Sequence, residues 1–321
     1  MQHAKLSPSS SARWLSCTGS VKAEQAFPSS TTSYAAEGTT AHALAELCLT
    51  TNDHPTKYIG QTLEGHIVDE DMAEHIAAYC AYVKSYSGVH LYEHRFSLTK
   101  WIPDSFGTSD AVVIDEANKT AHIIDLKYGK GVSVDAEQNT QAMLYALGVI
   151  DDLGFMYEFD TVVIHIYQPR IKNYSSWQTS TKYLLEWAEW VSQRAKETQL
   201  PDAPRTPSEK ACQWCKAKAT CKALLDHTHN VIMNDFDDLT SINPDTLTDN
   251  ELRVVMDNAK LIKSWLDAVE AHIFDKLNNG QAFDGYKLVE GRSTRTWQDE
   301  QQAAILLADK VPSDKLFTQK L

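Results

Sequence analysis

The chain has 321 residues, of which 43% are hydrophobic and 23% are charged, so it is long enough for a globular domain with an appendage. Its 30 Lys and Arg against 43 Asp and Glu leave a net charge of −13, which excludes a protein held on nucleic acid by bulk positive charge. No apolar run reaches the about 18 residues of a membrane helix, and the N-terminus lacks the apolar stretch of a secretory signal. We therefore expect a cytoplasmic enzyme with no membrane partner.

Hydrophobic periodicity predicts an α/β protein with a mixed sheet. Segments with a 3.6-residue period predict helices, and short segments rich in Val, Ile and Tyr predict strands. In chain order we expect helices over 8–14, 40–50 and 71–86, strands over 90–98, 111–115 and 121–127, a helix over 135–150, a strand over 161–167, helices over 181–199 and 250–277, and a strand near 286–290. Composition changes after residue 225, which predicts a core over 1–225 and a mostly helical extension over 226–321.

The most informative stretch, residues 106–127, reads FGTSDAVVIDEANKTAHIIDLK. A hairpin centred on Ala117–Asn118 places Asp110 opposite Asp125, with Cβ atoms about 5 Å apart. A turn centred one residue later leaves the two carboxylates diagonal. Lys127 follows Asp125 by two residues and therefore projects from the same face. Two carboxylates and a lysine on one face indicate a site for a hard divalent cation such as Mg²⁺, although the two aspartates alone could be ordinary strand-end residues.

Two predicted helices carry polar residues that could face this site. Gln138, Gln141 and Tyr145 have the spacing of one helical stripe, which is either a ligand-facing or a solvated face. His42, near the start of an earlier helix, shares a face with Glu46. Taken alone, a histidine in such a position is more often an ordinary hydrogen-bonded core or surface residue.

The ordered motifs resemble those of the PD-(D/E)XK nuclease superfamily. The resemblance is carried by Gly38-x3-His42, Gly107-Thr108-Ser109-Asp110, Asp125-Leu126-Lys127 and Gln141-x3-Tyr145. The branch that they resemble most is the RecB-like exonucleases, which include the CRISPR-adaptation and phage lambda-type exonucleases. One departure is that Asp125 stands where the superfamily more commonly has Glu. The resemblance implies a PD-(D/E)XK core, a mixed central sheet flanked by helices.

The resemblance also implies roles for individual residues. It implies that Mg²⁺ or Mn²⁺ is held by His42, Asp110, Asp125 and the Leu126 carbonyl. Lys127 would orient or activate the attacking water, and Gln141 and Tyr145 would contact DNA near the scissile phosphate. Glu37 could assist a second ion. Basic residues that could contact the DNA, although each could also be a plain surface charge, are Arg13, Lys130, Arg170 and Lys172.

Three cysteines lie within ten residues of one another: Cys212, Cys215 and Cys221. Together with Cys17 they resemble the iron–sulfur staple of the same nuclease branch, which implies a [4Fe–4S] cluster held by four thiolates. The alternative is a structural Zn²⁺ bound by the three clustered cysteines with His227 or His229. The remaining cysteines, Cys48 and Cys80, are predicted to be core residues.

The whole chain, including HIYQPR at 165–170 and GYKLVEGRS at 285–293, resembles a phage and prophage family of this superfamily. This implies a metal-dependent DNA exonuclease of phage replication or recombination, working in the host cytoplasm on single-stranded DNA or DNA ends. A phage single-strand binding or annealing protein is the implied partner. The alternative is a non-catalytic or partner-dependent DNA-binding protein that keeps the nuclease fold and a structural zinc site.

Overall fold

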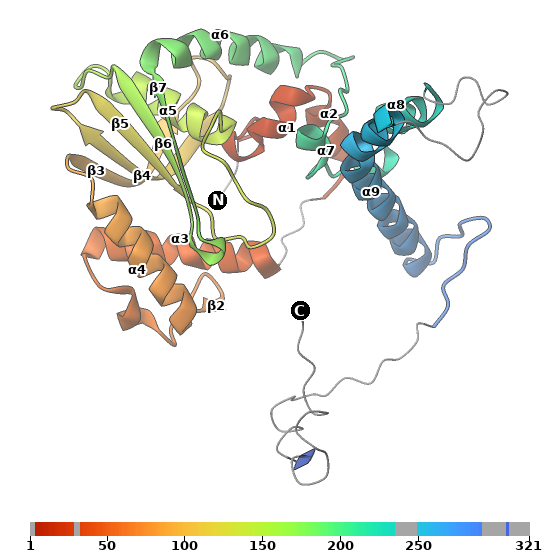
Figure 1. Ribbon diagram of the computed structural model, residues 1–321, viewed down its shortest axis with the longest axis horizontal. Helices are drawn as coiled ribbons and strands as arrows, with labels where there is room; N and C mark the ends of the chain where they lie inside the picture. The colour runs from red at the N-terminus through yellow and green to blue at the C-terminus, as the bar shows by residue number, and fades with distance from the viewer. Residues whose placement is uncertain (1–3, 29–32, 235–248, 291–305, 308–321) are drawn as a thin grey trace. The chain divides into compact units, whose positions relative to one another are not determined.

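The structure is a computed structural model that describes residues 4–28, 33–234, 249–290 and 306–307 (Figure 1). The chain divides into two compact units, 1–269 and 270–321, and the division falls within helix α9 (Asp249–Asn278). The elements that form the candidate site all belong to the first unit. None of the helices in the described ranges is long and apolar enough to cross a membrane.

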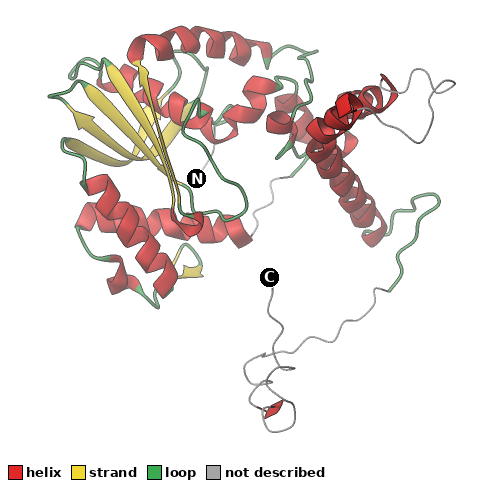
Figure 2. Ribbon diagram, in the orientation of Figure 1, coloured by secondary structure: helices red, strands yellow, loops and turns green. Residues whose placement is uncertain are grey.

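The first unit is built around a mixed sheet with helices on both of its faces (Figure 2). The sheet has five strands, which follow one another in chain order. These strands are β3 (Val89–Ser97), β4 (Phe106–Asp115), β5 (Thr120–Leu126), β6 (Thr161–Gln168) and β7 (Asn173–Ser180). All neighbours are antiparallel except β5 and β6, which are parallel. A parallel pair needs a crossover connection, and a helix lies between β5 and β6 in the chain. The expected α/β architecture with a mixed sheet is confirmed.

Two pairs of helices cover the two faces of the sheet (Figure 1). They are α3 (Ser33–Thr51) and α4 (Glu70–Lys84) on one face, and α5 (Thr140–Leu153) and α6 (Thr181–Glu197) on the other. Side chains alternate along the strands, so Val112 and Ile123 pack under α5 and α6. Val113 and Ile124 pack under α3 and α4. All four are fully buried, and the core is therefore two apolar layers separated by the sheet.

Shorter elements complete the described chain. They are η1 (Pro8–Ser10), α1 (Ser11–Ser16), α2 (Ser20–Ala23), η2 (Glu24–Ala26), η3 (Pro55–Tyr58), β1 (Thr62–Leu63), β2 (His66–Ile67), η4 (Pro169–Ile171), α7 (Glu209–Cys212), η5 (Lys218–Thr220) and α8 (Lys222–Asn234). Trp14 of α1 is buried in the layer under α5 and α6. Arg194 of α6 donates from Nε to the Leu15 carbonyl (2.8 Å), which fixes α1 against α6.

Side-chain caps decide where the helices begin. The Asn139 side chain accepts a hydrogen bond from the Ala142 backbone, so α5 begins at Thr140 and not at 135 as the sequence suggested. Gln138 lies before this cap, exposed, with a left-handed φ of 49°. The prediction that Gln138 shares a helical stripe with Gln141 is therefore wrong.

Other boundaries also differ from the expectation. Helix α3 begins at Ser33, before the expected residue 40, and β4 begins at Phe106, before the expected residue 111. Asp110 therefore lies inside a strand, and Glu37 lies inside a helix. Strand β7 was not predicted, because its sequence NYSSWQTS is mostly polar. The strand expected near 286–290 is absent among the described residues there, where only an isolated Phe283–Tyr286 bridge occurs.

Candidate functional site

Three carboxylates lie level with one another across β3, β4 and β5. One residue beyond the Tyr92–Ala111 pair, the register of β3 with β4 brings Glu93 level with Asp110. One residue beyond the Ala111–Ile124 pair, the register of β4 with β5 brings Asp125 level with Asp110 on its other side. The neighbouring row of paired residues is Tyr92, Ala111 and Ile124. The hairpin centred on Ala117–Asn118 is thus confirmed. Glu93 has a left-handed φ of 43° and interrupts the ladder at this row, a strained conformation for a residue with a Cβ.

Helix α3 brings an imidazole to the middle carboxylate. His42 Nδ1 lies 3.2 Å from Asp110 Oδ1. The other oxygen, Asp110 Oδ2, accepts a hydrogen bond from the Leu126 backbone N–H at 2.7 Å. The carboxylate is therefore fixed from two elements, and β5 supplies a backbone contact at the residue whose carbonyl was expected to bind metal.

On the α5 side, Lys127 connects the third carboxylate to the helix. Its Nζ lies 2.9 Å from Asp125 Oδ2 and donates to Gln141 Oε1 at 2.9 Å. Gln141 Nε2 in turn donates to Tyr145 Oη at 2.8 Å. The structure therefore links Asp125, Lys127, Gln141 and Tyr145 by successive contacts. Gln141 and Tyr145 lie on one helical stripe, as their spacing predicted.

The charges of this group shift one another's pKa. Burial raises the pKa of Glu93 to about 7, and the charge of Asp110 adds to the rise. Burial also raises the pKa of Asp125. For His42, burial acts to lower the pKa, but the charge of Asp110 outweighs burial and raises the pKa to about 9.

For Lys127, burial also acts to lower the pKa, but the charges of Asp125 and Asp110 raise the pKa above its usual value. Burial pushes the Asp110 pKa up, but His42 holds it below the usual range.

The donor set suits a metal ion. His42, Glu93 and Asp110 each offer a ligand atom, and these atoms lie within 4.8 Å of one another. Within the described ranges, no other group of His, Cys, Asp or Glu side chains meets that condition. Asp125 is only 2% exposed. Its Oδ2 atom is in ion-pair contact with the Lys127 ammonium, but it accepts no hydrogen bond. Three carboxylates against His42 and Lys127 leave a deficit of positive charge that a divalent cation would correct.

Glu93 is the site residue that sequence reasoning missed. Its strand was predicted, and its type is right for a metal ligand, but no motif marks it. Glu93 would have been found by extending the Asp110–Asp125 row into β3, but this requires the register of β3 with β4. That register is set by the connection from β3 to β4 rather than by a local pattern.

Glu37 and Arg170 do not join the carboxylate row in the structure. Arg170 Nη1 lies 2.6 Å from Glu37 Oε2, so the two residues form an ion pair between α3 and η4. The Arg170 guanidinium also stacks 4.7 Å from the centre of the Tyr128 ring. Glu37 lies on α3 about a turn and a half before His42, or about 7.5 Å along the helix.

The four cysteines of the predicted staple meet in one cavity. Cys17 from the N-terminal segment lines it together with Cys212, Cys215 and Cys221. The backbone N–H of Thr206 donates to Cys17 Sγ at 3.2 Å. All six cysteines are free, and Cys48 and Cys80 are buried in the layer under α3 and α4 as predicted.

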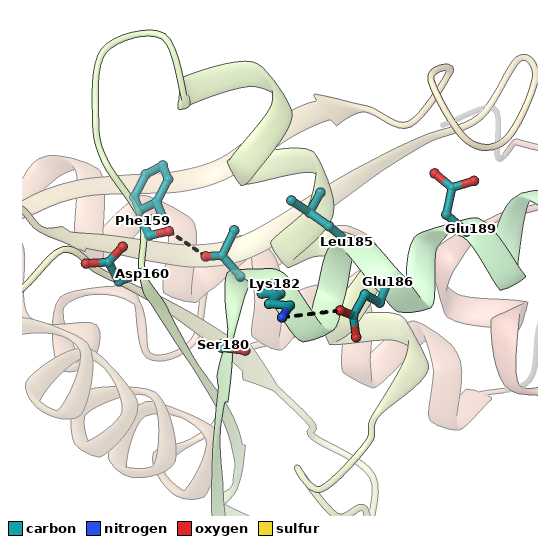
Figure 3. A pocket seen from close by; sticks show the side chains of 8 residues that line it. Phe159, Asp160, Ser180, Lys182, Leu185, Glu186 and Glu189 are labelled. Atoms are coloured by element: carbon teal, nitrogen blue, oxygen red, sulfur yellow. Dashed lines mark hydrogen bonds and ion pairs between the residues drawn. The ribbon is translucent and has the colours of Figure 1, made fainter.

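A further surface hollow of about 560 Å³ lies at the junction of β7 and α6 and contains none of these residues (Figure 3). Its charged side chains are Asp160, Glu186 and Glu189, with Lys182 as the cation. Lys182 faces Glu186 across 3.9 Å. Because carboxylates outnumber ammonium groups there, this hollow does not suit a phosphate-bearing ligand.

Comparison with known proteins places the chain in a family. The family described as "Protein of unknown function (DUF2800)" matches residues 3–321. The chain belongs to the DUF2800 family. The match covers the carboxylate row, Lys127 and all four staple cysteines, so both candidate centres are parts of a DUF2800 protein.

Among solved structures, the one described as "Crystal structure of SSO0001" resembles this DUF2800 chain distantly. The superposition has a TM-score of 0.28 and 12% sequence identity, and covers 65% of this chain and 83% of that chain. A likeness of this size carries no argument about the site.

Proposed function

We propose that this DUF2800 protein is a metal-dependent deoxyribonuclease with a PD-(D/E)XK core that degrades DNA from its ends. The observation that carries the proposal is the row Glu93–Asp110–Asp125, with the Lys127 ammonium in contact with its last member. Carboxylates gathered in this way need cations, and a phosphodiester with a divalent ion is a substrate that such a site suits.

The side chains present fit Mg²⁺ or Mn²⁺. Carboxylate and carbonyl oxygens are the ligands that both ions prefer, and His42 is the one nitrogen donor in an otherwise oxygen set. The residues that would hold the ion are His42, Asp110, Asp125 and the Leu126 carbonyl, with Glu93 as an additional carboxylate. When bound, a divalent ion would polarise the phosphate and lower the pKa of the attacking water.

The protein's own residues would position the reacting groups. Lys127 is fixed between Asp125 and Gln141, so its ammonium is preorganised to stabilise charge on the phosphate. Its raised pKa keeps it protonated, which suits orientation of the water and charge stabilisation better than proton abstraction. Burial raises the pKa of Tyr145 above its usual range, so it stays a neutral hydroxyl able to donate to a phosphate oxygen.

The cysteine cavity supports a [4Fe–4S] cluster held by Cys17, Cys212, Cys215 and Cys221. Thiolates are the usual ligands of such a cluster, which would tie α1 to the segment of α7 and α8. The alternative is a structural Zn²⁺ bound by the three clustered cysteines with His227 or His229.

The substrate and partners follow from the resemblance. We propose DNA ends or single-stranded DNA as substrate, and a role in phage replication or recombination with a single-strand binding or annealing protein. The rival function is that of a non-catalytic DNA-binding protein with a structural zinc. Such a protein would have the same fold, but it would not require Lys127.

A degradation assay tests the proposal. Linear single- and double-stranded DNA, labelled at either end, is incubated with the protein and Mn²⁺, Mg²⁺ or EDTA, with circular DNA as the control for endonuclease action. We expect degradation of linear DNA with metal only, and the label position will give the polarity. Folded, metal-loaded protein that binds DNA but degrades neither form would overturn the proposal and favour the rival.

A further inference from the structure

The loop between β5 and α5 is folded around one buried side chain, that of Gln168 at the end of β6. Gln168 is 1% exposed. Its Nε2 donates to the carbonyls of Gly129 at 2.8 Å and Val132 at 2.9 Å. Its Oε1 accepts from the Val134 backbone N–H at 3.2 Å and from Asn173 Nδ2 at 3.1 Å. A glutamine amide has two donor hydrogens and two acceptor positions, so Gln168 uses all of them on this loop and the adjoining turn.

Gln168, rather than the glycines, fixes the shape of this loop, which we call the Lys130 loop (residues 128–134). A Cβ at Gly129 or Gly131 would meet no atom within 4 Å, and neither glycine has a left-handed φ. The conformation of the loop therefore does not require glycine. Gln168 binds backbone carbonyls on both sides of Lys130 in the sequence, so it holds the backbone that carries this exposed side chain.

The same hydrogen bonds join two basic segments of the chain. Asn173 Nδ2 donates to the Val134 carbonyl at 2.7 Å, so the turn between β6 and β7 lies against the Lys130 loop. Residues 127–134 and 168–173 contain four cations and no carboxylate, although the whole chain has a net charge of −13. The two segments therefore form a basic patch on an acidic protein. Its cations are Lys127, Lys130, Arg170 and Lys172.

Two cations of the basic patch are exposed. Arg170 is paired with Glu37, and Lys127 belongs to the candidate active site. Lys130 and Lys172 are exposed, and neither forms an ion pair with any residue that the structure describes. Such lysines suit the phosphates of a DNA backbone, because each phosphate that they neutralise releases bound counterions.

The basic patch begins at the candidate active site. The Lys127 backbone N–H donates to the Tyr167 carbonyl at 2.9 Å, so the loop leaves the sheet beside the end of β6. Lys130 follows Lys127 by three residues, and their backbones are therefore at most about 11 Å apart. Because successive nucleotides of one strand rise about 3.4 Å in B-DNA, Lys130 lies within about three nucleotides of a phosphate held at Lys127.

We propose that Lys130 and Lys172 bind backbone phosphates of a DNA strand beside the bond that is cut, and that Gln168 is a positioning residue that sets the Lys130 loop for this contact. The inference rests on the proposed nuclease function, and it names the surface that holds the substrate strand. Gln168 itself is buried and acts through the loop. The hollow at β7 and α6, where carboxylates outnumber cations, provides a contrasting surface for the controls (Figure 3).

The test measures binding of a fluorescent single-stranded oligonucleotide as a function of salt, with Ca²⁺ in place of Mn²⁺, and KM and kcat for degradation with Mn²⁺. The variants are Lys130→Ala, Lys172→Ala, Gln168→Met, and a double variant that combines Lys130→Ala with Gln168→Met. Asn173→Ala, which removes two hydrogen bonds of a half-buried side chain, replaces Gln168→Met should that variant not fold.

Each kind of variant has a matched control. Lys182→Ala controls for the loss of an exposed lysine, because Lys182 lies in the acidic hollow. Thr198→Val controls for the loss of a buried hydrogen bond, because Thr198 Oγ1 donates to the Ala195 carbonyl at the end of α6. Thermal melts are recorded for every variant, so that changes in stability are separated from changes in DNA binding.

Each phosphate contact to single strands contributes about 0.7 to the slope of log K against log salt, so each lysine variant should bind on the order of fivefold more weakly at about 0.1 M salt. KM should rise by a similar factor while kcat stays near that of wild type, because Lys127 is unchanged. Gln168→Met should weaken binding in the same way. Because Gln168 acts through Lys130, adding Lys130→Ala to Gln168→Met should weaken binding little further. Both controls should bind as wild type does.

The outcomes separate the inference from the function on which it rests. A wild-type slope and affinity in both lysine variants, with DNA still degraded, would overturn the inference and leave the proposed function intact. Normal DNA binding in a folded Gln168→Met, or a double variant whose losses simply add, would overturn the positioning role of Gln168. A wild-type protein that neither binds nor degrades DNA would overturn the inference and the proposed function together.

Discussion

Gly107 lies against the ring of Tyr145 with no room for a side chain between them. A Cβ at position 107 would come within 2.8 Å of Tyr145 Cε1 and within 3.0 Å of Pro8 Cγ. The Gly107-Thr108-Ser109-Asp110 motif therefore contributes more than the carboxylate. Its glycine allows α5 to approach β4 closely enough for the Tyr145–Gln141–Lys127 contacts to form.

We predict that Gly107→Ala displaces Tyr145 and lowers the DNA degradation rate by about tenfold or more. Overpacking of this kind also costs about 1–3 kcal/mol of unfolding free energy. Activity and urea denaturation are measured together. Gly131→Ala is the control, because no atom lies within 4 Å of a Cβ there. Full activity in Gly107→Ala would show that the position of Tyr145 does not matter for the reaction.

Glu93→Gln tests whether the third carboxylate belongs to the metal centre. Removing a ligand charge should weaken Mn²⁺ binding by about tenfold or more, since even outer contacts of metal ligands contribute 10–100-fold. Isothermal titration gives the affinity directly. The exposed Glu74 of α4 provides the control, Glu74→Gln. Equal Mn²⁺ affinities for Glu93→Gln and wild type would remove Glu93 from the site.

Metal binding should also appear as thermal stabilisation. A ligand that binds only the folded protein stabilises it by about 2.7 kcal/mol at 100 times its Kd. We expect Mn²⁺ to raise the melting temperature of the wild type, and to leave that of Asp110→Asn unchanged. The exposed Asp104→Asn serves as control. A similar Mn²⁺-induced rise in Asp110→Asn would place the ion elsewhere.

Away from the site, a buried histidine, His165, paired with the half-buried His122, predicts how stability depends on pH. His165 Nε2 lies 3.0 Å from His122 Nδ1, and its Nδ1 lies 2.9 Å from Tyr82 Oη. Burial, with His122 adding to it, lowers the His165 pKa from 6.5 to about 4. The unfolded chain therefore binds more protons than the folded one between these values, and stability is lost as the pH falls through that window.

The expected contribution of His165 is about 2 kcal/mol between about pH 7 and pH 5. Urea denaturation at both pH values measures it. His165→Gln, which stays neutral, should lose stability less steeply over this range than wild type. His66→Gln changes an exposed histidine and should follow the wild type. An unchanged pH dependence in His165→Gln would show that His165 does not titrate as its burial implies.

The cysteine cavity makes a prediction about metal content. Protein purified without oxygen should be brown and contain iron and acid-labile sulfide. Cys215→Ser should lose both, whereas Cys48→Ser, a change in the core under α3 and α4, should keep them. A colourless protein with one zinc per chain would contradict the cluster and support the zinc alternative.

Local patterns were sufficient to predict the β4–β5 hairpin. Its two apolar strands flank a polar turn, which predicted the pairing but left two turn centres open. The structure has the centre on Ala117–Asn118, the one that sets Asp110 against Asp125. Glu93 was not placed in this row, because the residues between β3 and β4 form a longer connection, which does not fix how the two strands pair. Gln138 was misplaced because the Asn139 cap, and not the hydrophobic pattern, decides where α5 begins. The ion pair of Glu37 with Arg170 joins residues that are far apart in sequence, which no single sequence can show.

The most direct measurement compares wild type with Lys127→Ala in DNA degradation and in DNA binding. Lys127 contacts Asp125 and Gln141, whereas Lys182 is exposed in the acidic hollow at β7 and α6, so Lys182→Ala is the matched control. The account predicts that Lys127→Ala binds DNA and Mn²⁺ but degrades DNA at least about 100-fold more slowly, as loss of a preorganised charge usually does. Lys182→Ala should keep the wild-type degradation rate. Equal rates for wild type and Lys127→Ala would contradict the proposed nuclease site.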